Sequence, residues 1–427
     1  MRILFLTPGL PYPPNKGTSI RNYNLIKQLS ARHEVHLLSF VWSEEELAWL
    51  PALRECCQSI ETVMAPRRGF PRRALSVFLS PLPDMALRLP SPEFRAKLAV
   101  MLGREPFDLV QVEGIELAQY GLDLINGDIS LIHPAPSSVF DNHNAEYVLQ
   151  QRAWEIDRRY PLRWAGALYS FIQWRKLRAY EAMVCRSFDK VIAVSEADRN
   201  ALHRIVPPVD IAVVPNGVDC ALFSSQVPAD AYPAPESRIK HEASLIFTGT
   251  MDFRPNIDAV TWFCQEVLPL IKKDIFHVHF YIVGKSPPPE VRRLGEDPAV
   301  TVTGYVDDVR PYMIHSRVYV VPLRMGSGTR LKVLQAMAMG IPVVSTTAGA
   351  EGIAARPGED ILIADDPTTF AQQVVSLLND EERRKKMAAR GRALMEASYD
   401  WAVIVPRLER VYSQLKHPPV DEQGATG

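Results

Sequence analysis

Two glycines and two cations lie close together in the run Gly326-Ser327-Gly328-Thr329-Arg330-Leu331-Lys332. The short β-branched run Val318–Val321 precedes it, and an apolar periodicity typical of a helix continues through Ala338. Glycines let a backbone approach a phosphate closely, and a helix starting here would add unpaired N–H groups and a partial positive charge. Arg330 can hold two phosphate oxygens at once and Lys332 adds a point charge, so the run predicts a diphosphate site. The alternative is a flexible turn with two solvated cations on a surface helix.

A second polar cluster follows an apolar run in the first half of the chain. Ser138–Phe140 predicts a strand, and Asp141-Asn142-His143-Asn144 comes directly after it. Ligands of α/β proteins bind at the carboxyl ends of parallel strands, so this polar cluster is a candidate for a ligand site. Asn144 could instead cap the following helix, and the polar residues before it could close a turn. The two roles can coexist.

Both clusters follow predicted strands, and the sequence has the alternation of apolar runs and helical segments that predicts such strands. Short apolar runs alternate with helix-period segments such as Ile20–Ala31 and Glu44–Cys57, which is typical of parallel sheets wrapped by helices. The strands predicted in the first half are Ile3–Leu6, Val35–Phe40, Leu109–Val112, Ser138–Phe140, Val191–Val194 and Ile211–Val214. Those predicted in the second half are Leu245–Thr248, His279–Val283, Val300–Thr303, Val318–Val321, Val343–Ser345 and Ile361–Ile363. The predicted fold class is α/β, with two doubly wound units.

The length of 427 residues exceeds what one hydrophobic core usually fills, so two domains are expected. The Pro- and Ala-rich stretch Gln226–Glu236 lacks apolar periodicity and suits a linker. Apolar residues recur at helical spacing near the end of the chain, which predicts a helix that packs on a folded surface: Trp401, Val405, Leu408 and Val411. We predict these parts: N-terminal domain 1–218, linker 219–240, C-terminal domain 241–395, tail helix 396–416 and disordered tail 417–427.

The composition excludes several classes of protein. The 48 basic and 49 acidic residues nearly balance, so nothing favours a nucleic-acid partner. The five cysteines are odd in number and lack zinc-site spacing, which suits a reducing cytoplasm. The first apolar run, Ile3–Leu6, is too short for a signal peptide, and no run approaches the roughly 20 apolar residues that cross a bilayer. We therefore expect a cytoplasmic protein, which could also lie on the inner face of the membrane.

The stretch Gly328–Thr346 is similar to the donor-site signature of the retaining GT-B glycosyltransferases grouped with family 4, also described as glycosyl transferases group 1. Four further stretches fall in the order of that family, so the resemblance covers most of the chain: Val214–Asp219, Thr248–Met251, Tyr281–Lys285 and Val302–Val306. It implies two Rossmann-like domains that face each other across a cleft. The C-terminal domain would hold the nucleotide sugar, and the tail helix would cross back onto the N-terminal domain.

The resemblance also implies an activity. The family transfers a hexose or similar sugar from a nucleoside diphosphate-sugar with retention of configuration, usually without a bound metal. No cofactor is then expected beyond the nucleotide sugar as co-substrate. The expected acceptor is a glycan, a lipid-linked molecule or a small molecule, and the expected setting is the synthesis of cell-surface polysaccharide or glycoconjugates.

Site residues follow from the same resemblance. The implied catalytic residues are His143, Arg330 and Lys332, and Thr18 and Arg21 lie on the acceptor side, where Arg21 could meet an acidic acceptor. The implied donor-binding residues are Gly17, Gly249, Arg254, Gly284, Gly326, Ser327, Gly328, Thr329, Gln335 and Glu351. Two of these have ordinary alternatives, because Gly17 could mark only a capped helix start and Glu351 could be a solvated loop acid.

The chain departs from the family pattern at the residues that read the sugar and the ribose. Many members have two glutamates with seven residues between them, and the matching positions here are Ser327 and Gln335. Gln335 can still hydrogen-bond ribose hydroxyls, whereas Ser327 lacks the reach of a glutamate. An Arg and a Lys that commonly follow the first C-domain strand are Thr250 and Asn256 here, and we hypothesise that Arg330 and Lys332 replace them. The rival functions are a non-catalytic nucleotide-sugar-binding protein and a GT-B sugar-nucleotide epimerase.

Two stretches of the N-terminal half mix cations with apolar and aromatic residues, Arg67–Leu79 and Pro161–Arg178. Such a mixture suits an anionic lipid surface, which would bring the protein to a lipid-linked acceptor. Aromatic stripes at helical spacing are more often core, and charge runs are usually solvated. Peripheral membrane contact is thus a hypothesis of the sequence.

Overall fold

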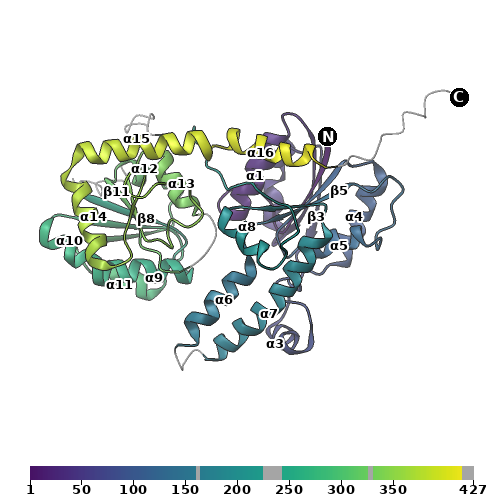
Figure 1. Ribbon diagram of the computed structural model, residues 1–427, viewed down its shortest axis with the longest axis horizontal. Helices are drawn as coiled ribbons and strands as arrows, with labels where there is room; N and C mark the ends of the chain where they lie inside the picture. Colours follow the sequence, from purple (N-terminus) through teal and green to yellow (C-terminus); the bar gives the residue numbers. More distant parts are fainter. Residues whose placement is uncertain (160–163, 225–242, 326–329, 416–427) are drawn as a thin grey trace. The chain divides into compact units, whose positions relative to one another are not determined.

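The computed structural model describes most of the chain: residues 1–159, 164–224, 243–325 and 330–415, without the side chains of residues 70–74. These residues form two compact units (Figure 1). Unit 1 comprises Met1–Pro215 and the tail from Val405 onward, and unit 2 comprises Asn216–Ile404. Each unit contains one parallel sheet covered by helices, so the predicted α/β class with two doubly wound units is confirmed. The predicted linker stretch Gln226–Glu236 and the tail 417–427 lie outside the described residues.

Unit 1 is built on a seven-stranded parallel sheet in the order β3-β2-β1-β4-β5-β6-β7. The strands are β1 (Arg2–Thr7), β2 (Glu34–Val41), β3 (Ser59–Met64), β4 (Leu109–Glu113), β5 (Ser137–Asn142), β6 (Lys190–Ala193) and β7 (Ile211–Val213). The α-helices are α1 (Gly17–Leu29), α2 (Leu50–Arg54), α3 (Phe70–Leu79), α4 (Pro92–Arg104), α5 (Ala118–Ile125), α6 (Glu146–Asp157), α7 (Trp164–Ser187) and α8 (Glu196–His203). Ile3–Leu6 are 0% exposed, because helices cover both faces of the central strands, and this explains the unbroken apolar runs.

Two elements of unit 1 differ from the sequence prediction. The sequence does not predict β3, because this edge strand mixes polar and apolar residues and is mostly half-buried. The predicted helix Glu44–Cys57 is wrong, since a 3₁₀ helix covers Glu44–Trp49 and α2 is short. Pro51 lies in the first turn of α2, where its missing N–H is tolerated. A helix running through this position would lose a hydrogen bond and clash with the proline ring.

Unit 2 is built on a six-stranded parallel sheet in the order β10-β9-β8-β11-β12-β13. The strands are β8 (Ser244–Thr248), β9 (His279–Val283), β10 (Val300–Gly304), β11 (Val318–Val321), β12 (Val343–Ser345) and β13 (Leu362–Ile363). The helices are α9 (Arg254–Trp262), a π-helical turn (Phe263–Val267), α10 (Leu268–Asp274), α11 (Pro289–Leu294), α12 (Arg310–Ile314), α13 (Leu331–Ala338), α14 (Pro367–Asn379) and α15 (Glu381–Ser398). Every strand predicted for this half is present. One edge of this sheet is β10, whose backbone pairs only with β9 among the described strands.

The helical tail consists of two helices, because Tyr399 and Asp400 separate α15 from α16 (Trp401–Ser413). The apolar face of α16 is buried, since the four residues named for it in the sequence are at most 7% exposed. In unit 2, the start of α16 packs closely on Gly217, where an added Cβ would lie 2.7 Å from Ile404.

The end of α16 packs within unit 1. The Glu409 carboxylate accepts from Arg32 Nε at 2.8 Å, and the buried Tyr412 hydroxyl donates to Gln111 Oε1. The tail therefore reaches the middle of the seven-stranded sheet, because Gln111 lies on β4.

Candidate functional site

The loops that follow β8, β9 and β10 lie together in unit 2. The Gly249 amide donates to the Val283 carbonyl at 3.0 Å, and the Gly284 amide donates to the Gly304 carbonyl at 3.2 Å. A Cβ added to Gly284 would lie 1.7 Å from the Gly249 carbonyl oxygen, a distance that no side chain could accommodate. Glycine is thus required for this close approach of two backbones. The structure brings together two of the predicted donor-binding residues, Gly249 and Gly284, at the carboxyl ends of the strands.

The Lys332 side chain reaches from α13 to the same place. Its Nζ donates to Asn256 Oδ1 at 2.9 Å and lies 4.0 Å from the centroid of the Phe247 ring. The Asn256 amide donates in turn to the Thr250 carbonyl at 2.8 Å, which fixes the orientation of the oxygen that Lys332 contacts. The space above Gly249 is filled by this ammonium group, because a Cβ there would lie 2.8 Å from Nζ. A cation therefore stands directly beside the loop that follows β8.

The surroundings of Lys332 weaken its hold on its proton. Burial, with Arg330 nearby, lowers the pKa of Lys332 to about 7. An ammonium group that has lost part of its hydration gains more from an incoming anion than a solvated one does. Arg330 immediately precedes α13, and its Nη2 donates to the Ala348 carbonyl at 3.4 Å in the loop after β12. Two positive side chains and the amino terminus of α13 thus share one region of unit 2, which is an arrangement suited to anion binding.

The remaining predicted residues of unit 2 are distributed around this region. Gly326, Ser327, Gly328 and Thr329 lie outside the described residues. Arg254 is exposed at the start of α9, Gln335 is half-buried on α13, and Glu351 is half-buried in the loop after β12.

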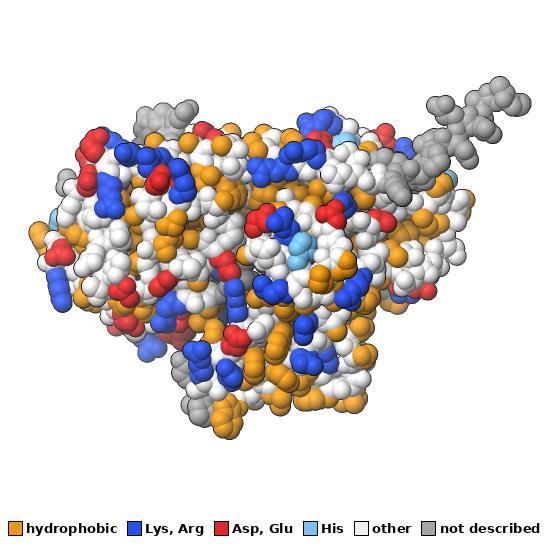
Figure 2. Space-filling view, viewed as in Figure 1, with side chains coloured by type: hydrophobic (Ala, Val, Ile, Leu, Met, Phe, Trp, Pro, Cys, Tyr) orange, Lys and Arg blue, Asp and Glu red, His pale blue; other side chains and the backbone are white. Residues whose placement is uncertain are grey.

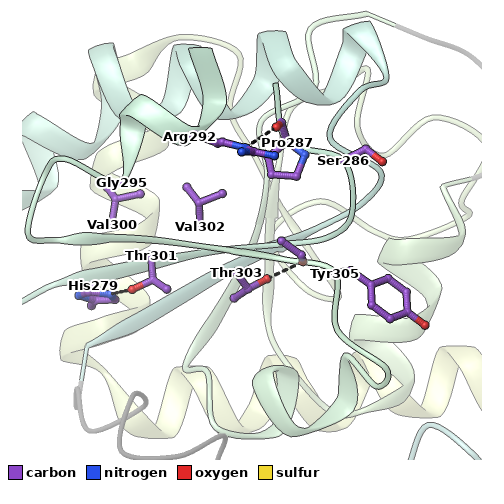
Figure 3. A pocket seen from close by; sticks show the side chains of 11 residues that line it. His279, Ser286, Pro287, Arg292, Gly295, Val300, Thr301, Val302, Thr303 and Tyr305 are labelled. Carbon is purple, nitrogen blue, oxygen red and sulfur yellow. Dashed lines mark hydrogen bonds between the residues drawn. The ribbon is translucent and has the colours of Figure 1, made fainter. Parts of the chain in front are cut away.

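An open hollow of about 850 Å³ lies along the outer edge of β10 (Figure 3). Thr301 and Thr303 point into it from the strand, and Tyr305 and Ser286 stand at the carboxyl ends of β10 and β9. The Arg292 guanidinium donates to the Pro287 carbonyl at 2.9 Å and closes another side. None of the predicted donor-binding residues that the structure describes lines this hollow, although Ser286 is two residues beyond Gly284. The hollow is therefore a neighbour of the cationic region and not the same place.

His143 forms the centre of a second polar cluster, in unit 1. It follows β5, and its Nε2 lies 2.7 Å from Glu113 Oε2 at the end of the neighbouring strand β4. Burial opposes the charged imidazole, but the hydrogen bond to Glu113 and its charge outweigh this and raise the pKa of His143. The side chain is 16% exposed, whereas that of Glu113 is 0% exposed. A His143 ring held in this way keeps one edge for a ligand.

Arg21 lies beneath this cluster, away from solvent. The guanidinium donates to both oxygens of Asp141, at 2.9 and 3.1 Å, and to the Pro215 carbonyl at 3.1 Å. Arg21 is 1% exposed and Asp141 is 0% exposed. Burial raises the pKa of Asp141 to about 6, and the guanidinium opposes this rise. This placement differs from the expected contact of Arg21 with an acidic acceptor, because its donors are used inside the unit.

Gly17 and Thr18, by contrast, are exposed at the start of α1. The backbone amide of Lys16 donates to Ser19 Oγ at 3.0 Å. The loop therefore contains a capped helix start, which is the ordinary alternative given above for Gly17. Capping leaves the side chain of Thr18 accessible to an acceptor.

Two buried carboxylates hold the loop that carries His143. Glu181 on α7 accepts from Asn142 Nδ2 at 3.2 Å and from the backbone amides of Glu146 and Tyr147 at 2.9 and 2.7 Å. Asp198 accepts from the Ala145 amide at 3.1 Å. The first helical amides of α6 are thus satisfied by an acid from another helix. Burial raises the pKa of Glu181 to about 8, and these donors oppose that rise.

Glu113, Asp141 and His143 also offer ligand atoms within 4.8 Å of one another, which is a spacing that a metal ion could use. A cation there would compete with Arg21, whose Nη2 lies 2.8 Å from Asp141 Oδ2. The carboxylate of Asp141 is already compensated by the guanidinium, so the geometry favours the ion pair over a metal.

Glu113 and Gln111 belong to this cluster and are not among the residues predicted from the sequence. Both are 0% exposed, and they alternate with Val110 and Val112 in β4. The sequence does contain one indication of these two residues. Polar residues at every second position of a buried strand lie on one face of the sheet, and buried polar side chains need hydrogen-bond partners there. The partner Tyr412 could not have been found by local pattern, since it lies 301 residues away from Gln111.

Two family descriptions match the chain. Residues 16–222 match Glycosyltransferase Family 4, and residues 242–380 match Glycosyl transferases group 1. Together they take in most of the sequence and both clusters of site residues. The chain belongs to the glycosyltransferases of group 1 and family 4, as the resemblance of its motifs indicated.

Curated relatives agree at low identity. A 44.6-kDa protein of the cps region of Klebsiella pneumoniae is 22% identical over 411 residues, which is 93% of this chain and 96% of that protein. Phosphatidyl-myo-inositol mannosyltransferase of Mycolicibacterium smegmatis is 28% identical over 216 residues, which is 48% of this chain and 52% of that enzyme. The second match thus spans about half of each chain.

Solved structures establish the fold. HepE of Anabaena in complex with UDP is similar with a TM-score of 0.66 and 15% identity, over 97% of this chain and 100% of that one. WaaG, a glycosyltransferase involved in lipopolysaccharide biosynthesis, is similar with a TM-score of 0.64 and 14% identity, over the same shares of the two chains. The two α/β units therefore have the GT-B fold.

The buried pair Arg21 and Asp141 makes a prediction about stability. Arg21→Met should lower the free energy of unfolding by about 3–5 kcal/mol, because it leaves a buried carboxylate without its partner. The matched control is Arg32→Met, which breaks the exposed pair with Glu409 and should change stability little. Urea unfolding measures both. Equal effects of the two substitutions would contradict the assignment, and Asp141→Asn added to Arg21→Met should restore part of the loss.

Proposed function

We propose that this chain is a retaining glycosyltransferase that moves a sugar from a nucleoside diphosphate-sugar to an acceptor, without a metal ion. The observation that carries the proposal is the Lys332 ammonium, held by Asn256 beside Gly249, with Arg330 at the start of α13. These groups supply the positive charge that a departing diphosphate requires. The solved complex of the similar HepE contains UDP, which supports a nucleoside diphosphate as the ligand here.

In the proposed reaction, the bond between the anomeric carbon and the diphosphate oxygen breaks as the acceptor oxygen bonds to the same carbon. The electron pair of the broken bond stays on the diphosphate, and the acceptor proton leaves with it. Lys332, Arg330 and the amino terminus of α13 stabilise the negative charge that develops, and they do so without reorganising at the moment of reaction. His143 contacts the transferred sugar, and Gln335 hydrogen-bonds the ribose through its neutral amide.

The position of Lys332 supports the replacement suggested by the sequence. Where the family commonly has a lysine after the first strand of this unit, the chain has Asn256, and Lys332 Nζ lies 2.9 Å from the oxygen of that asparagine. In this proposal, the ammonium group of Lys332 on α13 takes the position that the ammonium group of a lysine at position 256 would occupy. This arrangement retains a cation at the diphosphate although the aligned residue is neutral.

We also propose a lipid-linked acceptor and peripheral contact with the cytoplasmic face of a membrane. None of the helices in the described parts of the chain is long and apolar enough to span a bilayer. Large apolar side chains are nevertheless exposed on α3 and at the start of α7: Leu75, Phe78, Leu79, Trp164 and Leu168. Lys176 Nζ on α7 donates to the carbonyls of Val77 and Ser80 at 2.7 and 2.6 Å, which ties the two helices together.

We call these five exposed residues the α3–α7 surface. Arg67, Arg175 and Arg178 are exposed nearby in the sequence, and Figure 2 shows hydrophobic side chains among lysines and arginines over this part of unit 1. Apolar groups beside cations suit an interface with anionic lipids. The similar mannosyltransferase of Mycolicibacterium smegmatis is named for a phosphatidyl-myo-inositol acceptor, which agrees with this choice of acceptor class.

The activity is tested by incubating the protein with labelled UDP- and GDP-sugars in the presence of lipid-linked acceptors. Transfer or slow hydrolysis is expected, and Arg330→Ala should lower kcat/KM about 100- to 1000-fold, because a charge that stabilises the leaving group is lost. The matched control is Arg383→Ala on α15, which should leave the kinetics unchanged. Binding without turnover would indicate a non-catalytic protein, and conversion of the donor sugar would indicate an epimerase; either result would contradict the proposal.

The lowered pKa of Lys332 predicts a pH dependence of donor binding. The protonated form binds the diphosphate, and with a pKa of about 7 in the free protein this form is lost as the pH rises from 6 to 8. Affinity for the nucleotide sugar should therefore fall over this interval, and binding near pH 7 should take up a proton. Isothermal titration calorimetry in buffers of different ionisation enthalpy measures the uptake. Lys332→Met should abolish it, and an uptake that persists in this variant would assign it to another group.

The membrane contact predicts that the protein floats with vesicles containing anionic lipid. Phe78→Ser combined with Leu79→Ser should reduce the bound fraction, because two side chains that are 72% and 73% exposed would no longer enter the lipid interface. The control is Phe276→Ser, which removes an 85% exposed phenylalanine from unit 2. Absence of flotation by the unaltered protein, or equal losses in the two variants, would contradict this part of the proposal.

A further inference from the structure

Among the described residues, the ring of His143 is hydrogen-bonded through one nitrogen. Its Nε2 lies 2.7 Å from Glu113 Oε2, and its Nδ1 faces Gly114, where an added Cβ would lie 3.8 Å away. Gly114 has a φ of +83°, which disfavours any residue with a side chain. No residue in the described part of the chain hydrogen-bonds Nδ1, so this nitrogen is the one that remains for a ligand, whereas Glu113 orients the ring through Nε2.

Glu113 is itself held by neutral donors. Gln111 Nε2 donates to Glu113 Oε1 at 2.6 Å. The Asn22 amide, with its nitrogen turned toward Glu113, donates to Oε2 at 2.8 Å and to the Thr18 carbonyl at 3.3 Å. Gln111, Asn22 and Glu113 are each at most 1% exposed. The imidazole of His143 is therefore the one group bonded directly to this buried carboxylate, among the described residues, that can bring a positive charge.

The last member of this chain of hydrogen bonds comes from the tail. The Tyr412 hydroxyl on α16 donates to Gln111 Oε1, which leaves the Gln111 amide nitrogen to donate to Glu113. A glutamine amide can turn over, and the Glu113 carboxylate oxygen accepts only from its nitrogen, so the Gln111 oxygen points the other way and accepts from the Tyr412 hydroxyl. Tyr412 is 1% exposed, so this hydrogen bond is buried. The orientation of His143 is thereby connected to the carboxyl-terminal helix.

We propose that Glu113 is a positioning residue for His143, and that Tyr412 on the tail helix supports this position through its hydrogen bond to Gln111. Glu113 keeps Nε2 as a proton donor and favours the doubly protonated ring, so that His143 presents an Nδ1–H group to an oxygen of the ligand. Docking of α16 then becomes a condition for a correctly oriented His143. The part of the inference that concerns catalysis rests on the proposed role of His143 in sugar transfer.

Other charged groups surround the ring and act on it as well. Asp141 favours the charged imidazole and Arg21 opposes it, but these two are paired with each other. Glu116 lies near the Nδ1 edge, since its Oε2 is 3.2 Å from the Cβ position of Gly114, and it is paired with Arg88 at 2.9 Å. Glu146 also faces His143, and burial, with Glu116 nearby, raises the pKa of its own carboxyl to about 7. Among these groups, Glu113 alone makes a hydrogen bond to the ring.

The first test follows the His143 ring itself by NMR titration of the full chain. Its signal is assigned by comparison with His143→Gln, because the chain has 10 histidines. In Glu113→Gln the midpoint should move to lower pH, and the neutral ring of the unaltered protein should carry its proton on Nε2. An unchanged midpoint, or a proton on Nδ1 in the unaltered protein, would overturn the role of Glu113. This readout needs no enzymatic activity, so it stands or falls separately from the proposed function.

The second test concerns the tail. Tyr412→Phe removes only the hydroxyl and should lower kcat for sugar transfer while KM for the nucleotide sugar stays the same, because the cations that bind the diphosphate lie in unit 2. The matched control is Tyr120→Phe, which removes another buried hydroxyl of unit 1, one that donates to the Leu89 carbonyl at 2.6 Å.

Both tyrosine variants should lose similar stability, and the control should keep its kcat. Equal kcat values in the two variants would show that Tyr412 only stabilises the fold. Tyr412→Phe is also examined by NMR, where the His143 signal should change in position or width while Tyr120→Phe leaves it alone. An unaltered His143 signal in Tyr412→Phe would contradict the connection even if the protein proves to have no transferase activity.

Discussion

The anion site that we propose in unit 2 depends on the contacts of one ammonium group, that of Lys332, which is largely withdrawn from water. Lys332 can stand beside the loop after β8 because that loop carries glycine at position 249 and because Gly284 lets the next loop come into contact with it. Asn256 and the Phe247 ring supply an oxygen and an aromatic face in place of water. In our proposal, each of these contacts prepares the site for a diphosphate. Their cost is a weakened hold on the proton, seen in a pKa of about 7.

Unit 1 handles buried charge in the opposite way, by pairing it. Arg21 compensates Asp141, and His143 is bonded to Glu113, all near the carboxyl ends of β4 and β5. A buried carboxylate without such a partner would be strongly destabilising, so the two pairs constrain which residues the cluster can accept. The two pairs therefore have different roles. Arg21 and Asp141 stabilise the unit, whereas His143 keeps one ring edge for a ligand.

Much of this arrangement is visible in the sequence, for a physical reason. Strands buried on both faces, such as Ile3–Leu6, must be apolar throughout, so β-branched runs locate them well. The apolar pattern does not predict β3, because an edge strand needs only partial burial. The predicted single helix over Glu44–Cys57 is wrong because Pro51 starts a new helical turn. The fold class and the prediction of Lys332 as a site residue thus come from local pattern.

What the sequence does not reveal are contacts between distant residues. Arg21 looks like a surface cation on an amphipathic helix, and only the sheet shows that Asp141, 120 residues later, takes its charge. The hydrogen bond between Glu113 and His143 also links residues that are distant in the sequence. Tyr412, near the end of the chain, is connected to this pair through its hydrogen bond to Gln111. Likewise, the sequence alone does not show that Lys332 contacts Asn256, the residue at the position where the family commonly has a lysine.

The relocation of this charge is tested most directly by moving it back. Nucleotide-sugar affinity is measured by calorimetry at pH 6.5 for the unaltered protein, for Lys332→Met and for Lys332→Met combined with Asn256→Lys. We expect the single variant to lose at least about tenfold in affinity, which is roughly 1.4 kcal/mol. The double variant should recover most of that loss, because the new ammonium enters the space that Lys332 vacates. Unchanged binding by Lys332→Met would contradict the account.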